Sequence, residues 1–541
     1  MKALVIGLDG GTYSILDPLM AAGHMPNLRE AVGGGARGNL LSTVPPVTAL
    51  AWPSFLTGKN PGKHGLFGWQ ERLNADFERP WVSSRKIHGP KLWQLANEQG
   101  LRTCFMNVPV TYPPEPLNGA MVSGMLTPGL EARFTYPPEL REALLASVPE
   151  YRIDVDVQHT EHDAGDSDAI RGFLREVGSA TRARGEAAQW LLERDRPDLA
   201  VVVFEMPDRL QHILWGYIER ALSARHGPGP GLPMREELLN CYRLLDQEVG
   251  RLVDLLPRDG YFVLLSDHGF GPLDTLVHID AWLVEQGWLV YDRYLAGRRQ
   301  VMRRIARLAG GFFPPSLKRK GRQALPQWKT LDWEETRAYA GLPSENGVFL
   351  NVRGREPAGV VREADYGTLR NEIIEALRCW RDPRTGEPIM RAVHQREEIY
   401  RGPFVADAPD IVFELCEGYK VSHLPSRGDL LTDVSHLPHG FHERKGVFAM
   451  RGPGIPSDIE VAQCSIEDVV PTLLYALGLS LPDDLDGSVL FEAFAPTWRS
   501  RNPLLSHRAA EAEDRHGAHS AYSDEEEAAI AEHLRNLGYL E

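Results

Sequence analysis

The sequence predicts an α/β protein with a mostly parallel central sheet, helices on both faces of that sheet, and a smaller mixed α/β insertion. At 541 residues and 43% hydrophobic, the chain has ample material for one large core. Short apolar runs that are continuous rather than alternating are typical of strands buried on both faces. Five such runs occur, at residues 3–8, 199–206, 261–266, 411–415 and 446–450. Between them, 185–195 and 235–256 repeat apolar residues at helical spacing, and this alternation favours a layered α/β domain.

The first strand, residues 3–8, follows a single lysine and ends in Asp9-Gly10-Gly11. That run is too short for a secretory signal, and no segment approaches the ~20 apolar residues of a membrane span. Five scattered cysteines without a CxxC pair indicate a reduced compartment, so we expect a cytoplasmic protein. A net charge of −15 argues against binding a nucleic-acid duplex.

The chain divides into four predicted segments. Residues 1–290 are the first part of the α/β core, 291–405 a basic linker with a smaller cap-like α/β insertion, 406–495 the return of the core, and 496–541 a linker and terminal helix. Residues 298–322 hold nine arginines and lysines and no acid. They are interpreted as a solvated helix or linker, or as a basic amphipathic helix that contacts an anionic membrane surface.

A helix is predicted near the C-terminal end of the sequence. Ser523 and Glu526 form a capping box, and Gly538 can end the helix. Its apolar stripe consists of Ile530, Leu534 and Leu537. We expect this stripe to dock on the body of the protein, with an oligomer contact as the alternative.

Carboxylates and imidazoles follow three of the predicted strands. The strand at 3–8 leads into Asp9, the strand at 199–206 into Asp208 and His212, and the strand at 261–266 into Asp267 and His268. Ligands bind at this edge of an open α/β sheet, although a single Asp there is commonly only a turn or cap residue. These side chains are ligands for zinc or manganese, and five of them suit two ions, the arrangement used for phosphoryl transfer.

Two ions that share five ligands lack at least one more. His436, His439 and His442 precede the strand at 446–450. If that strand runs antiparallel to the others, its start lies at the same edge of the sheet and brings one of these histidines to the site.

Thr48 begins a turn-rich stretch, "TALAWPSFLTGKNPGKHG". A threonine hydroxyl is a weak nucleophile, but coordination to a metal lowers its pKa and makes it competent. The alternative is that Thr48 only caps a helix. A helix N-terminus behind the hydroxyl would also favour an anionic phosphate.

Seven stretches, in order, are similar to those of a known family: "GLDGG", "MPNLREAVGGGARGNL", "TALAWPSFLTGKNPGKHG", "PDRLQH", "SDHGFGP", "GFHERKGVFAMRGPGI" and "IEDVVPTLLYALGLSLPDDLDGSVL". From Met1 to about residue 490, the chain resembles the alkaline phosphatase superfamily and, within it, type I phosphodiesterases and nucleotide pyrophosphatases. The resemblance implies two divalent metal ions, zinc first and manganese second. The implied ligands are Asp9, Thr48, Asp267 and His268 for one ion, and Asp208, His212 and His442, with His439 as second choice, for the other.

The same resemblance implies that Thr48 attacks phosphorus to give a phosphothreonine, which a water then releases. The implied substrate is a small phosphodiester or nucleotide-like pyrophosphate. Where well-studied relatives have an Asn, this chain has Ala51, so we expect a backbone N–H near Ala49 to hold the phosphoryl oxygen. The "AW" after the Thr and the "LRNLGYLE" tail look closer to a poorly characterised cytoplasmic branch.

Alternative functions remain at this stage. The same site would serve a phosphomonoesterase or a phosphoryl or headgroup transferase, and a metal-bound scaffold without turnover is the third hypothesis. A threonine at the nucleophile position, in place of serine or a formylglycine precursor, favours phosphodiester chemistry. Trp52 and Trp215 lie near site residues in the sequence and are predicted either to stack on a planar leaving group or to pack in the core.

Overall fold

The computed structural model describes residues 1–155, 167–223, 234–292, 327–423, 429–509 and 521–536. The basic segment 298–322 and the predicted helix-end residues Leu537 and Gly538 lie outside the described residues.

A ten-stranded sheet forms the centre of the molecule, with parallel strands in its middle. Strand β1 (Ala3–Leu8) lies between β6 (Leu199–Phe204) and β7 (Tyr261–Leu265) and is parallel to both. Beyond β6 come the parallel strands β3 (Thr103–Val108) and β4 (Gly119–Ser123). The predicted strands at 3–8, 199–206 and 261–266 are therefore confirmed, and they end at one edge of the sheet.

On the other side of β1, beyond β7, the sheet continues with two antiparallel pairings. Strand β16 (Lys445–Arg451) runs antiparallel to β7, and β2 (Ala36–Leu41) runs antiparallel to β16. The start of β16 therefore lies at the edge where β1, β6 and β7 end, as expected. Short strands complete the sheet: β5 (Thr135–Tyr136), β17 (Ile459–Glu460) and β18 (Cys464–Ser465).

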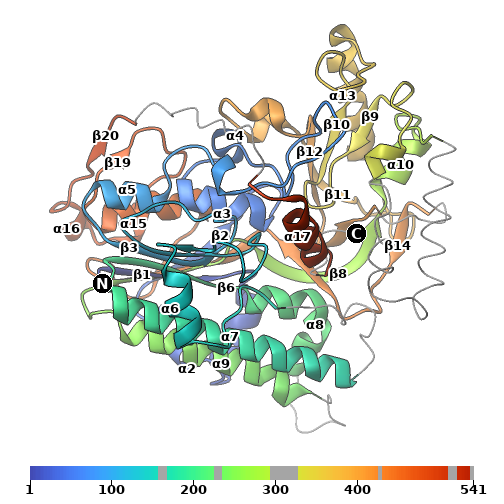
Figure 1. The fold of residues 1–541 in the computed structure, drawn as a ribbon. Coiled ribbons are helices and arrows are strands. Elements are labelled where there is room, and N and C mark those ends of the chain that lie inside the picture. Colours follow the sequence, from blue (N-terminus) through green and yellow to red (C-terminus); the bar gives the residue numbers. More distant parts are fainter. Residues whose placement is uncertain (156–166, 224–233, 293–326, 424–428, 510–520, 537–541) are drawn as a thin grey trace.

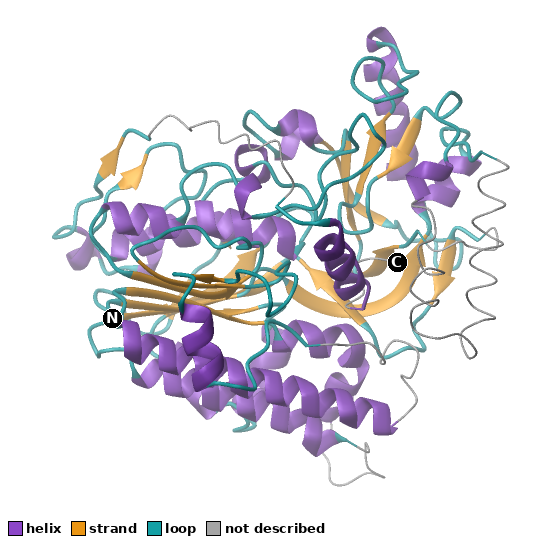
Figure 2. Ribbon diagram, viewed as in Figure 1, coloured by secondary structure: helices purple, strands orange, loops and turns teal. Residues whose placement is uncertain are grey.

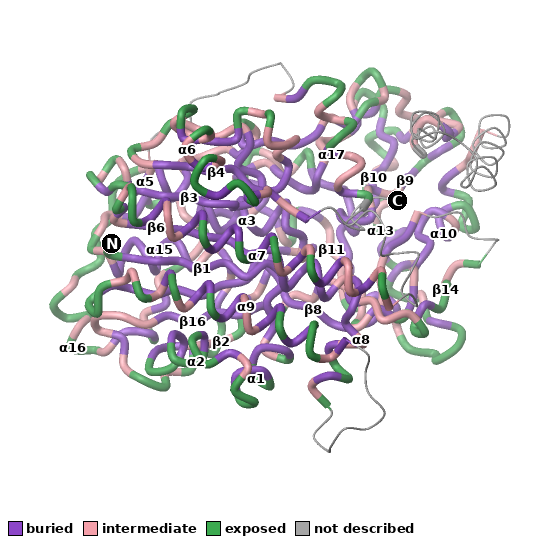
Figure 3. The backbone as a smooth tube through the Cα atoms, turned by 60° about the horizontal axis from the view of Figure 1, so that its bottom comes forward, coloured by how far each residue is buried: buried purple, intermediate pink, exposed green. Residues whose placement is uncertain are grey.

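Helices cover both faces of this sheet (Figure 1). Alternate residues of β1 explain why: Leu4, Ile6 and Leu8 pack in one hydrophobic cluster and Ala3 and Val5 in another. The first cluster is covered by α1 (Tyr13–Ala21), α2 (Pro26–Val32), α6 (Leu140–Ser147), α7 (Ser167–Asp195), α8 (Met206–Ser223) and α9 (Arg235–Asp254). The second is covered by α3 (Thr48–Thr57), α5 (Leu92–Glu98) and α15 (Val469–Ala476). Figure 3 shows the buried strands between these layers.

A second, four-stranded antiparallel sheet forms the insertion, in the order β11, β12, β10, β9. Its strands are β9 (Ala338–Ala340), β10 (Gly347–Leu350), β11 (Met390–Gln395) and β12 (Ile411–Leu415), with helices α10 (Ile279–Glu285) and α13 (Glu363–Cys379) in the same core. The assignment of 411–415 to the central sheet is wrong. The first three residues of this strand are apolar and buried because the small sheet is itself covered, with Ile411 and Phe413 in its separate core, whereas Glu414 interrupts the apolar run.

Buried ion pairs join the insertion to the segment after α3. Arg79 pairs with Glu345, and Arg72 pairs with Glu356. The two glutamate side chains are at most 2% exposed, so the charge of Glu345 depends on Arg79, and that of Glu356 on Arg72 together with Arg355.

A long, curved strand is the centre of a third, four-stranded sheet (Figure 2). Strand β8 (Gly269–Val277) begins directly after His268, and β13 (Gly418–Val421), β14 (Leu431–Asp433) and β15 (Gly440–Glu443) pair with it. In the antiparallel pairing of β15 with β8, His442 lies opposite Phe270. This register brings His442 beside the end of β7.

The terminal helix α17 (Asp524–Asn536) packs on the body of the same chain. Ser523 and Glu526 form the predicted capping box, and Ile530 and Leu534 are buried in the cluster of the helical layer. Shorter elements are α4 (Pro61–His64), α14 (Arg396–Ile399), α16 (Pro496–Arg499), β19 (Leu481–Pro482) and β20 (Ser506–His507). Among the described residues, no helix is long and apolar enough to cross a membrane.

Candidate active site and metal centre

Three side chains from the ends of β1 and β7 form one cluster of metal-ligating type. Asp9, Asp267 and His268 each offer a ligand atom, and these atoms lie within 4.8 Å of one another. His268 Nε2 is 3.5 Å from Asp9 Oδ1 and 3.3 Å from Asp267 Oδ2. All three side chains are fully buried, so this compact candidate site for a cation is enclosed by protein.

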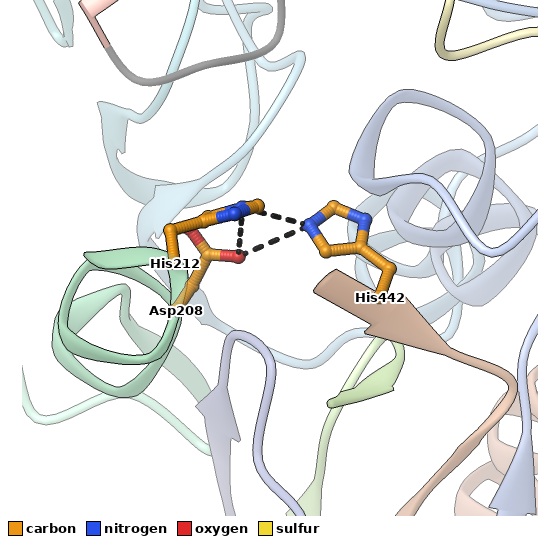
Figure 4. A group of neighbouring side chains, drawn as sticks. All are labelled: Asp208, His212 and His442. Atoms are coloured by element: carbon orange, nitrogen blue, oxygen red, sulfur yellow. Dashed lines mark hydrogen bonds and ion pairs between the residues drawn. The ribbon is translucent and has the colours of Figure 1, made fainter. Parts of the chain in front are cut away.

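A second cluster is formed by Asp208, His212 and His442 (Figure 4). Asp208 and His212 lie one turn apart on α8, and His442 faces them from β15. Asp208 Oδ1 is 3.3 Å from the Nε2 atoms of both histidines, which are 3.0 Å from each other. Three ligand atoms therefore converge on one point.

The two clusters are adjacent. His268 Nε2 lies 4.0 Å from Asp208 Oδ1, and the rings of His268 and His442 stack with their centroids 3.6 Å apart. Because they share this boundary, the six side chains form one site that suits two cations side by side.

Backbone carbonyls fix the orientation of two of the histidines. His442 Nδ1 is 3.0 Å from the Pro46 carbonyl, and His268 Nδ1 is 3.1 Å from the Gly269 carbonyl. A carbonyl oxygen only accepts, so Nδ1 carries the proton and the Nε2 lone pair faces the clusters. This is how metal-ligating histidines are held in proteins.

The buried carboxylates fit a divalent cation. Burial, together with Asp267 and Asp208, raises the pKa of Asp9 well above its usual range, and burial raises that of Asp267 to about 7. Asp9 Oδ1 and Asp267 Oδ2 have no hydrogen-bond partner among the described residues. Buried polar atoms are normally satisfied, so these two oxygens indicate a missing positive partner. The donor set of carboxylates and imidazoles is the one that zinc accepts.

Asp208 differs from the other two carboxylates. Burial favours its neutral form, but His212 and Arg209 outweigh this effect and hold its pKa well below the usual range. Burial also lowers the pKa of His212 and His442, which keeps both imidazoles in the neutral form that ligates metals.

Thr48 is the first residue of α3, and its side chain points into the site. Thr48 Oγ1 lies 3.2 Å from His268 Nε2, and the hydroxyl acts to lower the pKa of Asp267, against the effect of burial. Val47 occupies the N-cap position, and no side chain caps the helix. The alternative that Thr48 serves only as a helix cap is therefore wrong, although the helix N-terminus does lie behind its hydroxyl.

A glycine allows the close approach of these groups. Gly10 follows Asp9 with a φ of 67°, and its N–H donates to Asp267 Oδ1 at 3.2 Å. A Cβ atom at this position would lie 2.9 Å from the Phe270 ring and 3.1 Å from the Asp208 backbone. Gly10 therefore lets three site-bearing segments meet.

His439, the second choice for the late ligand, belongs to neither cluster among the described residues. Burial lowers its pKa to about 4, with Lys420, His212 and His436 acting in the same direction. His439 is therefore close enough to His212 for the two to interact electrostatically. His442 is the histidine whose Nε2 lies 3.3 Å from Asp208 Oδ1.

Both candidate tryptophans are buried. Trp52 has no exposed surface and donates from Nε1 to Asp9 Oδ2 at 3.4 Å, which orients that carboxylate. Trp215 is 4% exposed and stacks on Phe270. Substrate contact through either indole stays a prediction.

Sequence reasoning missed Arg209 and Asp154. Arg209 Nη1 donates to Asp208 Oδ2, and Asp154 binds the other side of the same guanidinium. Arg209 stands beside Asp208 in "PDRLQH", which is a local signal, whereas no spacing connects Asp154 to that motif.

The sequence matches the family model of type I phosphodiesterase / nucleotide pyrophosphatase over residues 3–443. The chain belongs to this family. The six ligand-type side chains and Thr48 all lie within the matched residues. As a type I phosphodiesterase/nucleotide pyrophosphatase family member, the protein is a hydrolase of phosphoric ester or anhydride bonds. A search of curated proteins finds no match.

Solved structures show that the fold is alkaline-phosphatase-like. Phosphonoacetate hydrolase from Sinorhizobium meliloti 1021, in complex with phosphonoformate, is similar with a TM-score of 0.51 at 16% identity, covering 88% of this chain and 95% of its own. An inactive murine ectonucleotide pyrophosphatase/phosphodiesterase in complex with AMP gives a TM-score of 0.49 at 12% identity, covering 92% of this chain and 100% of its own.

Proposed function

We propose that this family member cleaves phosphodiester or pyrophosphate bonds of small nucleotide-like substrates through a phosphothreonine at Thr48, beside two divalent metal ions. The observation that carries the proposal is the placement of the Thr48 hydroxyl 3.2 Å from His268 Nε2, at the boundary of two ligand clusters. Three imidazoles in the donor set favour zinc, with manganese as the second metal.

The residues divide into two ligand sets. Asp9, Asp267 and His268, with Thr48, would hold one ion, and Asp208, His212 and His442 would hold the other. When bound, such ions lower the pKa of a coordinated hydroxyl and neutralise charge on the reacting phosphoryl group.

The N-terminus of α3 offers backbone hydrogen-bond donors in place of the Asn side chain that well-studied relatives have at position 51. Position 51 is a buried alanine that offers no side-chain donor. The first backbone N–H groups of a helix have no acceptor within it, so those of Thr48 and Ala49 face the same region as the hydroxyl. We infer that the Ala49 N–H holds a phosphoryl oxygen during attack by Thr48.

The alternative activities and the predicted location and contacts are compatible with the same site. A phosphomonoesterase or a phosphoryl or headgroup transferase would use the same residues, so these alternatives differ only in substrate. A cytoplasmic location, membrane contact through residues 298–322 and an oligomer contact through α17 stay predictions.

Hydrolysis of bis-p-nitrophenyl phosphate beside p-nitrophenyl phosphate tests the proposal, with chelated protein reloaded with zinc or manganese. We expect a preference for the diester and its loss in Thr48→Ala. A preference for the monoester would assign the site to a phosphomonoesterase. Absence of turnover with either metal would contradict the proposal and favour a scaffold.

A further inference from the structure

We propose that the C-terminal helix α17 positions the metal ligand Asp208 through Asp154 and Arg209. The inference rests on the proposed two-metal site and adds to it positioning residues from two segments distant in sequence. The connection consists of three consecutive contacts, from His533 on α17 to Asp154, from Asp154 to Arg209, and from Arg209 to Asp208.

The contact nearest the site, between Arg209 and Asp208, gives the two carboxylate oxygens of Asp208 different partners. Oδ2 accepts a hydrogen bond from Arg209 Nη1, while Oδ1 faces the Nε2 atoms of His212 and His442. Arg209 therefore fixes the rotation of the carboxylate about its own axis, so that one oxygen points into the cluster. A carboxylate ligand needs such a partner, because rotation about its last bond is otherwise soft.

Asp154 in turn holds Arg209 on two edges. Arg209 Nε is 3.0 Å from Asp154 Oδ1, and Arg209 Nη2 is 2.6 Å from Asp154 Oδ2. This two-pronged geometry is the strongest arrangement of an arginine and a carboxylate. The Arg209 side chain is 2% exposed, so without Asp154 its charge would lose its main partner in a buried place.

His533 completes the connection from α17. Its Nε2 donates to Asp154 Oδ2 at 3.1 Å, and the Val155 N–H donates to Oδ1 at 2.8 Å. Ile530 and Leu534 are buried on the same face of α17 and fix the helix on the body. Both acceptor oxygens of Asp154 are thereby occupied, and its position is set by Arg209, its own backbone and α17 together.

A cavity of about 390 Å³ lies where α17 meets the segment around Asp154. Asp154, Ile530, His533 and Leu534 all line it. Because space remains beside this joint, the contact of His533 with Asp154 can be altered without filling or emptying the core. Substitution of His533 is therefore a mild perturbation that reaches Asp208 only through two other residues.

Zinc titration against a chromophoric chelator tests the proposal without requiring turnover. The subsite of Asp208 is first identified as the one lost in His442→Ala. We expect Asp154→Asn to weaken zinc binding at that subsite by about 10–100-fold, the range typical of residues that orient metal ligands, with the other subsite unchanged. His533→Ala should give a smaller loss at the same subsite, and His533→Gln, whose amide can donate to Asp154, should restore it.

The matched control is Glu525→Gln on the exposed face of α17, which should leave both subsites unchanged. The double variant Asp154→Asn/His533→Ala should bind zinc like Asp154→Asn alone, because both changes break one connection. Unchanged affinity at the Asp208 subsite in Asp154→Asn and His533→Ala would overturn the proposal, as would an equal loss at both subsites. Wild-type protein that binds fewer than two zinc ions would overturn this inference and the proposed function together. Normal zinc binding without hydrolysis would contradict only the proposed function.

Discussion

Replacement of Asp267 by asparagine should stabilise the metal-free protein while it abolishes zinc binding at its subsite. Burial raises the pKa of Asp267 from 3.8 to about 7. Below pH 3.8 the Asp267 carboxyl is protonated in both the folded and the unfolded state. Between pH 3.8 and about pH 7 it is protonated only in the folded state. The folded state therefore binds more protons, and stability of the metal-free protein falls as pH rises through this window.

The magnitude follows from the same values. A rise of about three pKa units, at about 1.4 kcal/mol each, amounts to about 4 kcal/mol above pH 7. An asparagine cannot ionise, and its Oδ1 can still accept the hydrogen bond from Gly10. Part of the destabilisation of the wild type by Asp267 is already present at pH 5. The difference in free energy of unfolding in favour of Asp267→Asn should therefore grow by about 3 kcal/mol between pH 5 and pH 8.

Urea unfolding of both proteins in chelator, at pH 5 and pH 8, measures this difference. Groups that do not interact with Asp267 cancel in the comparison. Asp9, whose pKa Asp267 helps to raise, ionises more easily in the variant and changes the difference in the same direction. With saturating zinc at pH 8 the wild type should become the more stable of the two proteins, because only the wild type gains the full free energy of zinc binding. An advantage that is the same at both pH values would refute the account of Asp267 as a buried carboxyl that needs a cation.

Three further predictions concern other parts of the chain. Burial lowers the pKa of His64 to about 3, so below pH 6.5 only the unfolded state takes up a proton. Between pH 6.5 and 4.5, urea unfolding should show that the wild type loses about 2 kcal/mol more of its free energy of unfolding than His64→Gln does. Elemental analysis should find one zinc per chain in His442→Ala and two in His439→Ala, and the reverse would reassign the late ligand. Arg79→Ala leaves Glu345 buried and unpaired, so thermal unfolding should show a loss of about 3–5 kcal/mol, and a neutral result would mean that this pair does not hold the insertion.

The sequence was sufficient to predict the centre of the fold and the edge of the sheet where most candidate site residues meet. Strands β1, β6 and β7 are short, continuously apolar runs that end in Asp or His, so both the sheet and its functional edge could be predicted. The pairing of β15 with β8 could not, because register between distant segments is set by tertiary packing. The choice of His442 over its neighbours depends on that register.

The sequence could not predict the sheet to which β12 belongs or the contact between Asp154 and His533. Strand β12 begins with three buried apolar residues, as the central strands do, because the small sheet has a covered core of its own, so hydrophobicity alone cannot assign it to a sheet. Asp154 and His533 are separated by 379 residues, and single charged residues in polar surroundings are usually solvated. Only the folded structure shows that they meet Arg209 behind Asp208, a candidate metal ligand.

The central claim is that Thr48 attacks phosphorus, and rapid acid quenching during turnover of bis-p-nitrophenyl phosphate tests it most directly. Attack by Thr48 Oγ1 forms a phosphorus–oxygen bond, releases one p-nitrophenolate and leaves a p-nitrophenylphosphoryl group on the threonine. Peptide mass spectrometry should find this group on Thr48 in the wild type, on the serine in Thr48→Ser, and nowhere in Thr48→Ala. Full turnover with an unmodified Thr48 peptide at every quench time would contradict the account.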